Sequence, residues 1–429
     1  MGLLYFRVEK EGLSITLMKE NALQKRAAIT LTVGVIYMMS IGVLYAWSVF
    51  SRVIEAQWFW SAAQAGLPFS LVIIHFATGN LIGGKLQAKI PARIVGTLGA
   101  VMVGLGLILS GVIGDSPSLV ALFFGVLTGL GIGLGYSSFL PTLLKWYHPD
   151  KKGFVSGWII GGFGLTAVYL APLASFLIDR YGLQAAFILL GVLTLLISLP
   201  LAQFLKTPPD GYTPLKPKNT KITAAAAPSV SITPTRMLST IEFYMLFFMF
   251  LCSVSTGQMV IGNITGIAEL QTGITDAALL ASLVSFMAIV NCGGRILSGV
   301  ISDKIGWANT LLLIFIIQCA NMIGFRFYTS LPVLIVGILF AGFCFGATLG
   351  VYPAITVERF GLKNYSANYG IMYMAFGGAG IAAPLIASYF LDFSGNYNTV
   401  YIICAIGMAV MILINLLIRK VVKPPTNES

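Results

Sequence analysis

Residues 183–204 read LQAAFILLGVLTLLISLPLAQF, a stretch of 22 residues without a charged side chain. A helix of this length rises about 30 Å, which matches the thickness of the hydrocarbon core of a bilayer. Eleven further apolar runs of similar length predict, together with this one, an all-α polytopic membrane protein with twelve transmembrane helices. The other runs lie near 27–50, 64–84, 93–113, 117–143, 154–177, 241–266, 276–298, 308–328, 331–355, 366–390 and 396–418.

The composition agrees with a protein embedded in lipid. Of the 429 residues, 57% are hydrophobic and 10% are charged, whereas soluble proteins carry about 25% charged residues. Too few polar side chains are present to cover a surface in water, so a soluble enzyme is excluded, and so is a disordered chain. No metal-ligand cluster, nucleotide-binding loop or pair of catalytic carboxylates stands out in the sequence. We therefore expect no enzymatic activity, no cofactor and no metal.

The net charge of +11 records the orientation of the chain in the membrane. Of the 26 lysines and arginines, 22 lie in the two terminal segments, in the central polar interval and in the loops on the same side. Because basic loops stay in the cytoplasm, both termini and the central interval are predicted to be cytoplasmic. No nucleic-acid partner and no obligate protein partner is expected. The short loops favour a plasma membrane of the bacterial inner-membrane type.

A polar interval separates the sixth run from the seventh and contains Pro208, Pro209, Pro214, Pro217, Pro228 and Pro234. Such a composition is typical of a linker. We therefore expect a cytoplasmic segment at 1–26, a six-helix bundle at 27–204, a cytoplasmic linker at 205–240, a second six-helix bundle at 241–418 and a cytoplasmic tail at 419–429. Met1 and Met18 are both candidate translation starts.

The two halves of the chain repeat at an offset of about 213 residues. Gly129 and Gly133 correspond to Gly342 and Gly346, Gly157 corresponds to Gly370, and Gly164 corresponds to Gly377. Because an even number of spans separates the two copies, both halves have the same orientation in the membrane. Two pseudo-symmetric halves of this kind predict a transporter that binds its substrate between them, near the bilayer midplane.

Arg295 is the one charged residue deep inside a predicted span; Asp276, Asp303 and Glu358 lie only at span ends. A charge inside a span costs about 3 kcal/mol or more unless a partner or water stabilises it. One interpretation is that the missing partner is a carboxylate substrate, because the guanidinium fork matches a carboxylate. The alternative is that Arg295 lies nearer the cytoplasm and snorkels to the interface or binds backbone carbonyls.

Three further kinds of polar residue lie within the spans. Asn80 occupies the position of the first half that corresponds to Arg295, so the charge is present once, which suits a monoanion. His75 could carry a proton, or it could hydrogen-bond a neighbouring helix as a neutral side chain. Tyr45 and Tyr136 lie beside glycines near mid-span, and their hydroxyls need partners. They are candidates for substrate contact, with packing as the alternative role.

Residues 299–306, GVISDKIG, connect the eighth and ninth runs. They resemble the signature loop of the major facilitator superfamily, and the resemblance covers nearly all of residues 25–420. In that family the acid and the base of this loop link helices on the cytoplasmic side and bias the conformational switch, which implies a gating role for Asp303 and Lys304. The equivalent loop of the first half, GKLQAKIP at 84–91, departs from the family because Ala88 replaces the acid.

Within the superfamily, the chain is similar to the oxalate/formate antiporters and the monocarboxylate transporters. The shared motifs are GVLYAWS at 42–48, KWYHPDKKG at 145–153 followed by Ser156 and Gly157, and NCGGR at 291–295 followed by SDK at 302–304. The resemblance implies that Arg295 binds a carboxylate. Phe376 stands where the antiporters have a second cation, a lysine in helix eleven, and Asn291 stands where animal monocarboxylate transporters have an aspartate. The first-helix lysine of those transporters has no counterpart.

These features predict a proton-coupled symporter of small monocarboxylates such as lactate or pyruvate, which works by alternating access. An oxalate/formate-type anion exchanger and a carboxylate sensor that does not transport are the alternatives. The expected substrate-binding residues are Arg295, Tyr45, Tyr136, Phe345, Leu349 and Phe376, of which the last three would form an apolar wall in place of the second cation. The candidates for a proton or polar relay are His75, Asn80 and Asn291.

Overall fold

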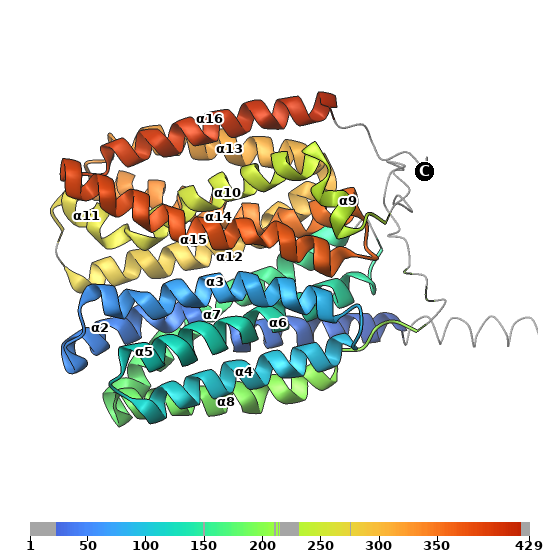
Figure 1. Ribbon diagram of the computed structural model, residues 1–429. Helices are drawn as coiled ribbons and strands as arrows, with labels where there is room; N and C mark the ends of the chain where they lie inside the picture. Colours follow the sequence, from blue (N-terminus) through green and yellow to red (C-terminus); the bar gives the residue numbers. More distant parts are fainter. Residues whose placement is uncertain are drawn as a thin grey trace, which may run out of the picture.

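A computed structural model describes residues 23–148, 151–209, 212, 214, 231–274 and 276–421, and every regular element in these ranges is helical (Figure 1). The first half contains a helix at 23–41, η1 (Val43–Ala46), α2 (Trp47–Trp58), α3 (Ala62–Leu86), α4 (Ala92–Ile113), α5 (Pro117–Val120), the π-helix η2 (Ala121–Thr128), α6 (Gly129–Leu144), α7 (Lys152–Tyr181) and α8 (Leu183–Gln203). The second half contains α9 (Pro234–Leu238), α10 (Ile241–Gly262), α11 (Ile264–Thr272), α12 (Ala277–Ile305), α13 (Trp307–Phe325), α14 (Leu331–Phe360), α15 (Tyr365–Ser394) and α16 (Asn398–Val421).

All twelve predicted spans are present, and the twelve-helix fold is confirmed. Ten of them are long and apolar enough to cross a membrane by the described residues alone; the other two are the interrupted first span and α15. Several helices extend beyond the predicted runs at their polar ends. The run that was expected to end near 298 continues as α12 to Ile305, because a helix can carry the charged residues of its last turn outside the hydrocarbon.

The first predicted span, near 27–50, is not one continuous helix. It breaks at Gly42 and continues as the 3₁₀ turn η1 and then as α2. A Cβ on Gly42 would lie 2.3 Å from the hydroxyl oxygen of Thr166, so only glycine fits where α7 passes this closely. Both Thr166 and Tyr169 donate hydrogen bonds to the carbonyl of Met39, at 2.8 and 2.9 Å. The break is therefore stabilised inside the membrane by side chains of a neighbouring helix.

The two halves lie one above the other in Figure 1, blue to green below and yellow to red above. Their two most extensive contacts are the crossings of α7 with α12 and of α3 with α15. A Cβ on Gly299 of α12 would lie 2.0 Å from the carbonyl oxygen of Gly153, and a Cβ on Gly84 of α3 would lie 2.1 Å from that of Ser366. These two contacts are equivalent in the sequence repeat. The repeat is therefore a structural one, and it relates these two crossings to each other.

We call the end of the bundle that contains α9 and the turns at 87–91, 306 and 361–364 the linker end; it lies on the right in Figure 1. Both described ends of the connection between the halves are attached there. The indole Nε1 of Trp146 donates to the carbonyl of Lys206 at 2.8 Å, and the N–H of Ile232 donates to the carbonyl of Phe360 at 3.1 Å. Most of the predicted linker at 205–240 lies outside the described residues, as do 1–22 and 422–429. The segment boundaries and their cytoplasmic location stay predictions.

We predict that Gly299→Ala lowers the thermal stability of the protein in detergent by several degrees. The added methyl group would overlap the backbone of Gly153, and overpacking of this kind costs about 1–3 kcal/mol. Gly293→Ala is the matched control on the same helix, because a Cβ there meets no atom within 4 Å and alanine favours the helix. Tryptophan fluorescence during heating measures both transitions. Equal midpoints for the two variants would contradict the close crossing.

Candidate functional site

Arg295 lies in the middle of α12, and its residue is only 2% exposed. Its guanidinium donates three hydrogen bonds to three different segments. Nε donates to Oδ1 of Asn291 at 3.1 Å, Nη1 donates to the carbonyl of Ile160 at 2.8 Å, and Nη2 donates to the hydroxyl of Tyr45 at 2.9 Å. Two of these partners belong to the first half of the chain, so Arg295 connects the halves. One of the three bonds therefore goes to a backbone carbonyl, as the alternative interpretation of Arg295 expects.

Glycines allow α12 to come close enough for these contacts. A Cβ on Gly350 of α14 would lie 2.3 Å from the carbonyl oxygen of Arg295, and one on Gly157 of α7 would lie 2.8 Å from the same oxygen. Gly164 faces the guanidinium itself, with Cζ and Nη1 at 3.3 Å from its Cβ position. A larger residue at these positions would move α12 or displace the charged group.

The charge of Arg295 has no acidic partner among the described residues, because its three acceptors are an amide, a carbonyl and a hydroxyl. Removing a charge from water is costly unless other groups compensate for the lost hydration. A guanidinium has five N–H donors, and three of them are used here. The site can therefore still donate from Nη1 and Nη2, and a carboxylate that accepted both bonds would also neutralise the charge.

Tyr45 reaches the guanidinium because of the break in the first span. The 3₁₀ turn η1 begins directly after Gly42, and the N–H of Tyr45 donates to the Gly42 carbonyl at 3.2 Å. The ring of Tyr45 packs edge-on against Phe163 of α7, with centroids 5.5 Å apart. The irregular backbone thus positions a hydroxyl that a continuous helix would carry in a different direction.

Five rings form an aromatic cluster beside this site: Phe76, Tyr136, Phe163, Tyr373 and Phe376. Phe76 of α3 lies at its centre, with centroid distances of 5.3 Å to Tyr136, 5.4 Å to Phe163, 5.1 Å to Tyr373 and 5.9 Å to Phe376. Tyr136 and Tyr373 are also electrostatic neighbours of Arg295. The structure therefore brings two of the predicted site residues, Tyr136 and Phe376, into one cluster next to the guanidinium.

The other two members of the predicted apolar wall lie on α14. Phe345 packs against Gly257 of α10, where its Cβ and ring carbons lie within 2.8 Å of the glycine's Cβ position, and Leu349 is buried one turn later. Neither Phe345 nor Leu349 is among the hydrogen-bond partners of Arg295 or the five rings of the aromatic cluster. The grouping of Phe345 and Leu349 with Phe376 in one apolar wall therefore stays a prediction.

The three relay candidates differ in their surroundings. Asn291 accepts a hydrogen bond from Arg295, as described above. His75 donates from Nδ1 to the carbonyl of Leu71 at 2.8 Å, so it bonds its own helix instead of a neighbouring one. Asn80 is 1% exposed, and neither its Oδ1 nor its Nδ2 has a hydrogen-bond partner among the described residues. Of the three, Asn80 has the strongest need for a further polar partner.

The sequence profile of the Major Facilitator Superfamily matches residues 28–325 and 310–429. The chain belongs to the major facilitator superfamily. It is therefore an integral membrane protein of a family of transporters.

Three other members of the superfamily are similar to this chain over most of their length. The chain is 29% identical to the uncharacterized MFS-type transporter YhjX of Escherichia coli, over 82% of this chain and 86% of that protein. It is 27% identical to the oxalate:formate antiporter of Oxalobacter formigenes, over 88% and 87% of the two chains, and 25% identical to monocarboxylate transporter 12 of Rattus norvegicus, over 77% and 71%. The solved structure of a variant of the E. coli fucose:proton symporter FucP superimposes with a TM-score of 0.70 at 15% identity, over 91% and 98% of the chains, and so shares the fold.

The superfamily's signature loop joins the two halves at the linker end. Asp303 accepts hydrogen bonds from the backbone N–H groups of Gly153 and Phe154, at 2.9 and 3.0 Å, in the first turn of α7. A carboxylate is favoured there because a helix N-terminus carries partial positive charge. Lys304 lies exposed in the last turn of α12. The first half lacks the acid at Ala88, and its contact is neutral: Gln87 accepts from the hydroxyl of Ser366 at 3.4 Å.

Several residues of this major facilitator's central site are not apparent from the sequence. The carbonyl of Ile160, the ring of Phe163 and the ring of Phe76 all touch the arginine or its cluster. A backbone acceptor leaves no signal in a sequence, and phenylalanine is common in membrane helices. One signal was readable, namely the four-residue spacing of Tyr365, Tyr369 and Tyr373 along α15.

We predict that Asp303→Asn opens the linker end more often. The substitution keeps an acceptor but removes the charge that favours the helix N-terminus. Ser156→Cys in a background without the native cysteines provides a buried reporter beside Gly350 at this crossing. Maleimide labelling of the reporter should become several times faster. Asp276→Asn is the control, because Asp276 caps its own helix through the N–H of Leu279. An unchanged labelling rate in Asp303→Asn would contradict the gating role.

Proposed function

We propose that this protein is a secondary transporter of small monocarboxylates, such as lactate or pyruvate, and that it works by alternating access. The observation that carries the proposal is the buried charge of Arg295, whose partners among the described residues are all neutral. A substrate carboxylate would supply the missing negative charge. The similarity to the oxalate:formate antiporter and to monocarboxylate transporter 12, over most of the length of each, supports this substrate class.

The surroundings of Arg295 favour a monoanion. Its equivalent in the first half is the neutral Asn80, and Phe376 lies within the aromatic cluster, in stacked contact with Tyr373 at 4.9 Å. Among the described contacts of these rings, no second cation is present that could bind the other carboxylate of a dianion. Tyr45 and Tyr136 would donate to the carboxylate or to a substrate hydroxyl, and Phe376 would contact the apolar body, with Phe345 and Leu349 completing the wall.

Substrate binding and the motion of the halves would be linked through the same guanidinium. Arg295 is on the second half, and its bonds to Ile160 and Tyr45 cross to the first half. A carboxylate that accepts the remaining N–H groups of Nη1 and Nη2 would neutralise the guanidinium and so weaken its bonds to these two acceptors, which would loosen the connection between the bundles at 27–204 and 241–418. The bundles would then rock about the site, with Asp303 and Lys304 at the gate and the linker end facing the cytoplasm of the cell.

Proton symport is the coupling that we propose. An anion that crosses with one proton moves no net charge, and Arg295 is neutralised only while the anion is bound. His75, Asn80 and Asn291 are the candidates for a proton or polar relay. Symport therefore requires few titrating side chains inside the bundle.

We predict that purified protein in liposomes accumulates labelled lactate under an inward proton gradient and that Arg295→Lys lowers the initial rate at least tenfold. Lysine keeps the charge but loses the planar fork, and a charge-assisted hydrogen bond contributes about 1.5–3 kcal/mol. Arg326→Lys, at the exposed end of α13, is the matched control and should retain the rate of the natural protein. Full uptake by Arg295→Lys would contradict the assignment of Arg295 as the carboxylate-binding residue. Uptake that does not depend on the proton gradient would exclude symport.

We predict that oxalate competes poorly with lactate uptake by the natural protein and competes measurably in Phe376→Lys. The new ammonium would provide the second cation that a dicarboxylate needs. Phe376→Leu is the apolar control and should leave oxalate a poor competitor. Strong oxalate competition in the natural protein, together with rapid counterflow, would instead support an anion exchanger.

A further inference from the structure

Three tyrosines form a column along one face of α15. Tyr365, Tyr369 and Tyr373 follow each other at intervals of four residues, which places them on the same side of a helix. Successive ring centroids lie 5.4 and 5.5 Å apart, and each residue is at most 2% exposed. The tyrosine column begins beside Arg295 at Tyr373 and runs toward the linker end, over about 12 Å at 1.5 Å per residue.

Two of the three hydroxyls of this column, and two polar side chains beside it, have no hydrogen-bond partner in the described part of the chain. The hydroxyls of Tyr365, Tyr369 and Tyr136 are buried without a hydrogen-bond partner among the described residues, as is the amide of Asn80. Asn80 is adjacent to α15, because its backbone carbonyl oxygen lies 3.2 Å from the Cβ position of Gly370. Each unmet buried group costs about 1–3 kcal/mol. Several unpaired hydrogen-bonding groups in one region favour the binding of a polar molecule between these side chains.

Two other buried tyrosines, Tyr37 and Tyr352, have protein partners. The hydroxyl of Tyr37 donates to the carbonyl of Gly96 at 2.7 Å, and that of Tyr352 donates to the carbonyl of Leu246 at 2.8 Å. Both lie within a single half. The column instead lies where α15 of the second half faces α3 and α6 of the first half. Its hydroxyls would therefore line the space that opens when the halves separate at the linker end.

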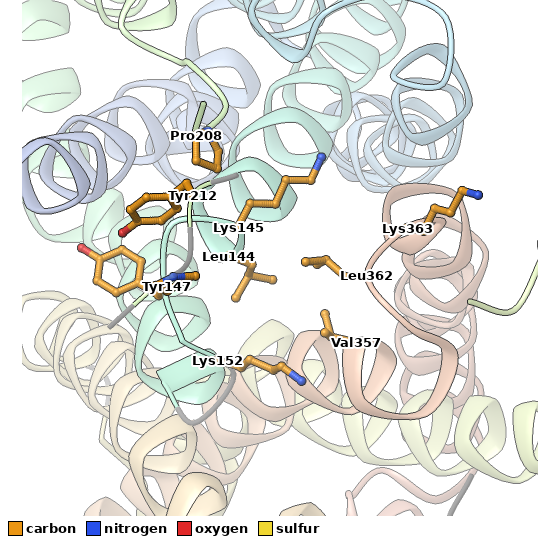
Figure 2. Close-up of a pocket in the computed structure, with 10 residues that line it drawn as sticks. Leu144, Lys145, Tyr147, Lys152, Pro208, Tyr212, Val357, Leu362 and Lys363 are labelled. Carbon is orange, nitrogen blue, oxygen red and sulfur yellow. The ribbon is translucent and has the colours of Figure 1, made fainter. Parts of the chain in front are cut away.

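The column ends at a basic cavity of about 470 Å³ at the linker end. Figure 2 shows Lys145 and Lys152 of the first half and Lys363 of the second half around it, and none of the ten lining residues is acidic. Tyr365 follows the lining residue Leu362 by three positions, and its backbone N–H donates to the Leu362 carbonyl at 3.3 Å. Burial and the neighbouring Tyr212 raise the pKa of Tyr147, another lining residue, to about 12, so it remains a neutral donor.

We propose that the tyrosine column and the basic cavity form the path by which a carboxylate moves between Arg295 and the linker end. The proposal rests on the proposed function and extends it to a route. Neutral hydroxyls suit a path because a substrate must be bound well enough to enter and weakly enough to leave. The lysines at the mouth raise the local concentration of anions. Tyr136 and Tyr373 receive the anion from Arg295, and Tyr369 and Tyr365 pass it on.

The double variant Tyr365→Phe/Tyr369→Phe separates the path from the binding site. In liposomes its maximal rate of labelled lactate uptake should fall at least fivefold. The dissociation constant of lactate, measured by calorimetry on the detergent-purified protein, should change less than twofold because Arg295 is intact. Tyr401→Phe is the matched control, since Tyr401 of α16 is also buried with an unbonded hydroxyl but lies in a separate core cluster.

A second double variant, Lys145→Gln/Lys363→Gln, tests the lysines that line the basic cavity. Its uptake rate should fall severalfold at low ionic strength and lose most of its dependence on salt, because screening weakens attraction between exposed charges. Lys420→Gln, exposed near the end of α16, should behave like the natural protein.

The outcomes distinguish the path from the proposed function. If the natural protein neither binds nor takes up lactate, the proposed function fails and the path fails with it. If the natural protein transports lactate and the tyrosine double variant keeps its maximal rate, the path alone is overturned. Loss of lactate affinity as large as in Arg295→Lys would also overturn the path, because the column would then belong to the binding site.

Discussion

The burial of one permanent positive charge in a low-dielectric interior constrains this fold more than any other contact. Guanidinium cannot lose its proton at accessible pH, so Arg295 must be surrounded by oxygen atoms. The protein supplies an amide from α12, a carbonyl from α7 and a hydroxyl from η1. These oxygens have to converge on one point, and the irregular first span, the glycine-lined crossings and the aromatic cluster all contribute to that convergence.

In the proposed transport cycle, the same charge would couple ligand binding to the contact between the halves. Neutral dipoles stabilise Arg295 without neutralising it, so a carboxylate that accepted its two remaining N–H groups would add the missing negative charge. Because Ile160 and Tyr45 belong to the other half, weaker bonds from the neutralised guanidinium to them would act on the interface between the halves. The linker end is held separately, through Asp303 at the N-terminus of α7 and through the weaker neutral contact of Gln87 with Ser366. The two equivalent contacts are thus unequal in strength.

Much of the fold could be predicted from the sequence, and less of the site. The twelve spans and the internal repeat followed from hydropathy and glycine spacing, and Arg295 stood out as a lone charge. The roles of Tyr365 and Tyr369 did not follow, although their spacing was visible, because a tyrosine in a membrane helix usually packs or finds a partner. Their unsatisfied hydroxyls became apparent only once the facing helices were in place. The position of Phe345 against Gly257 could likewise not be deduced from its place in α14.

The sequence by itself determined the number and length of the spans, the repeat and the single buried cation. These properties are local, since the partition of a segment between lipid and water depends on that segment's own side chains. Only the tertiary structure decided which oxygens surround Arg295, where the first span breaks and which hydroxyls lack partners. Those properties depend on contacts between residues far apart in the chain, such as Tyr45 and Arg295, and on how closely their backbones approach. Steric fit between helices sets the distances between their backbones, and these distances cannot be read from the hydropathy of a single segment.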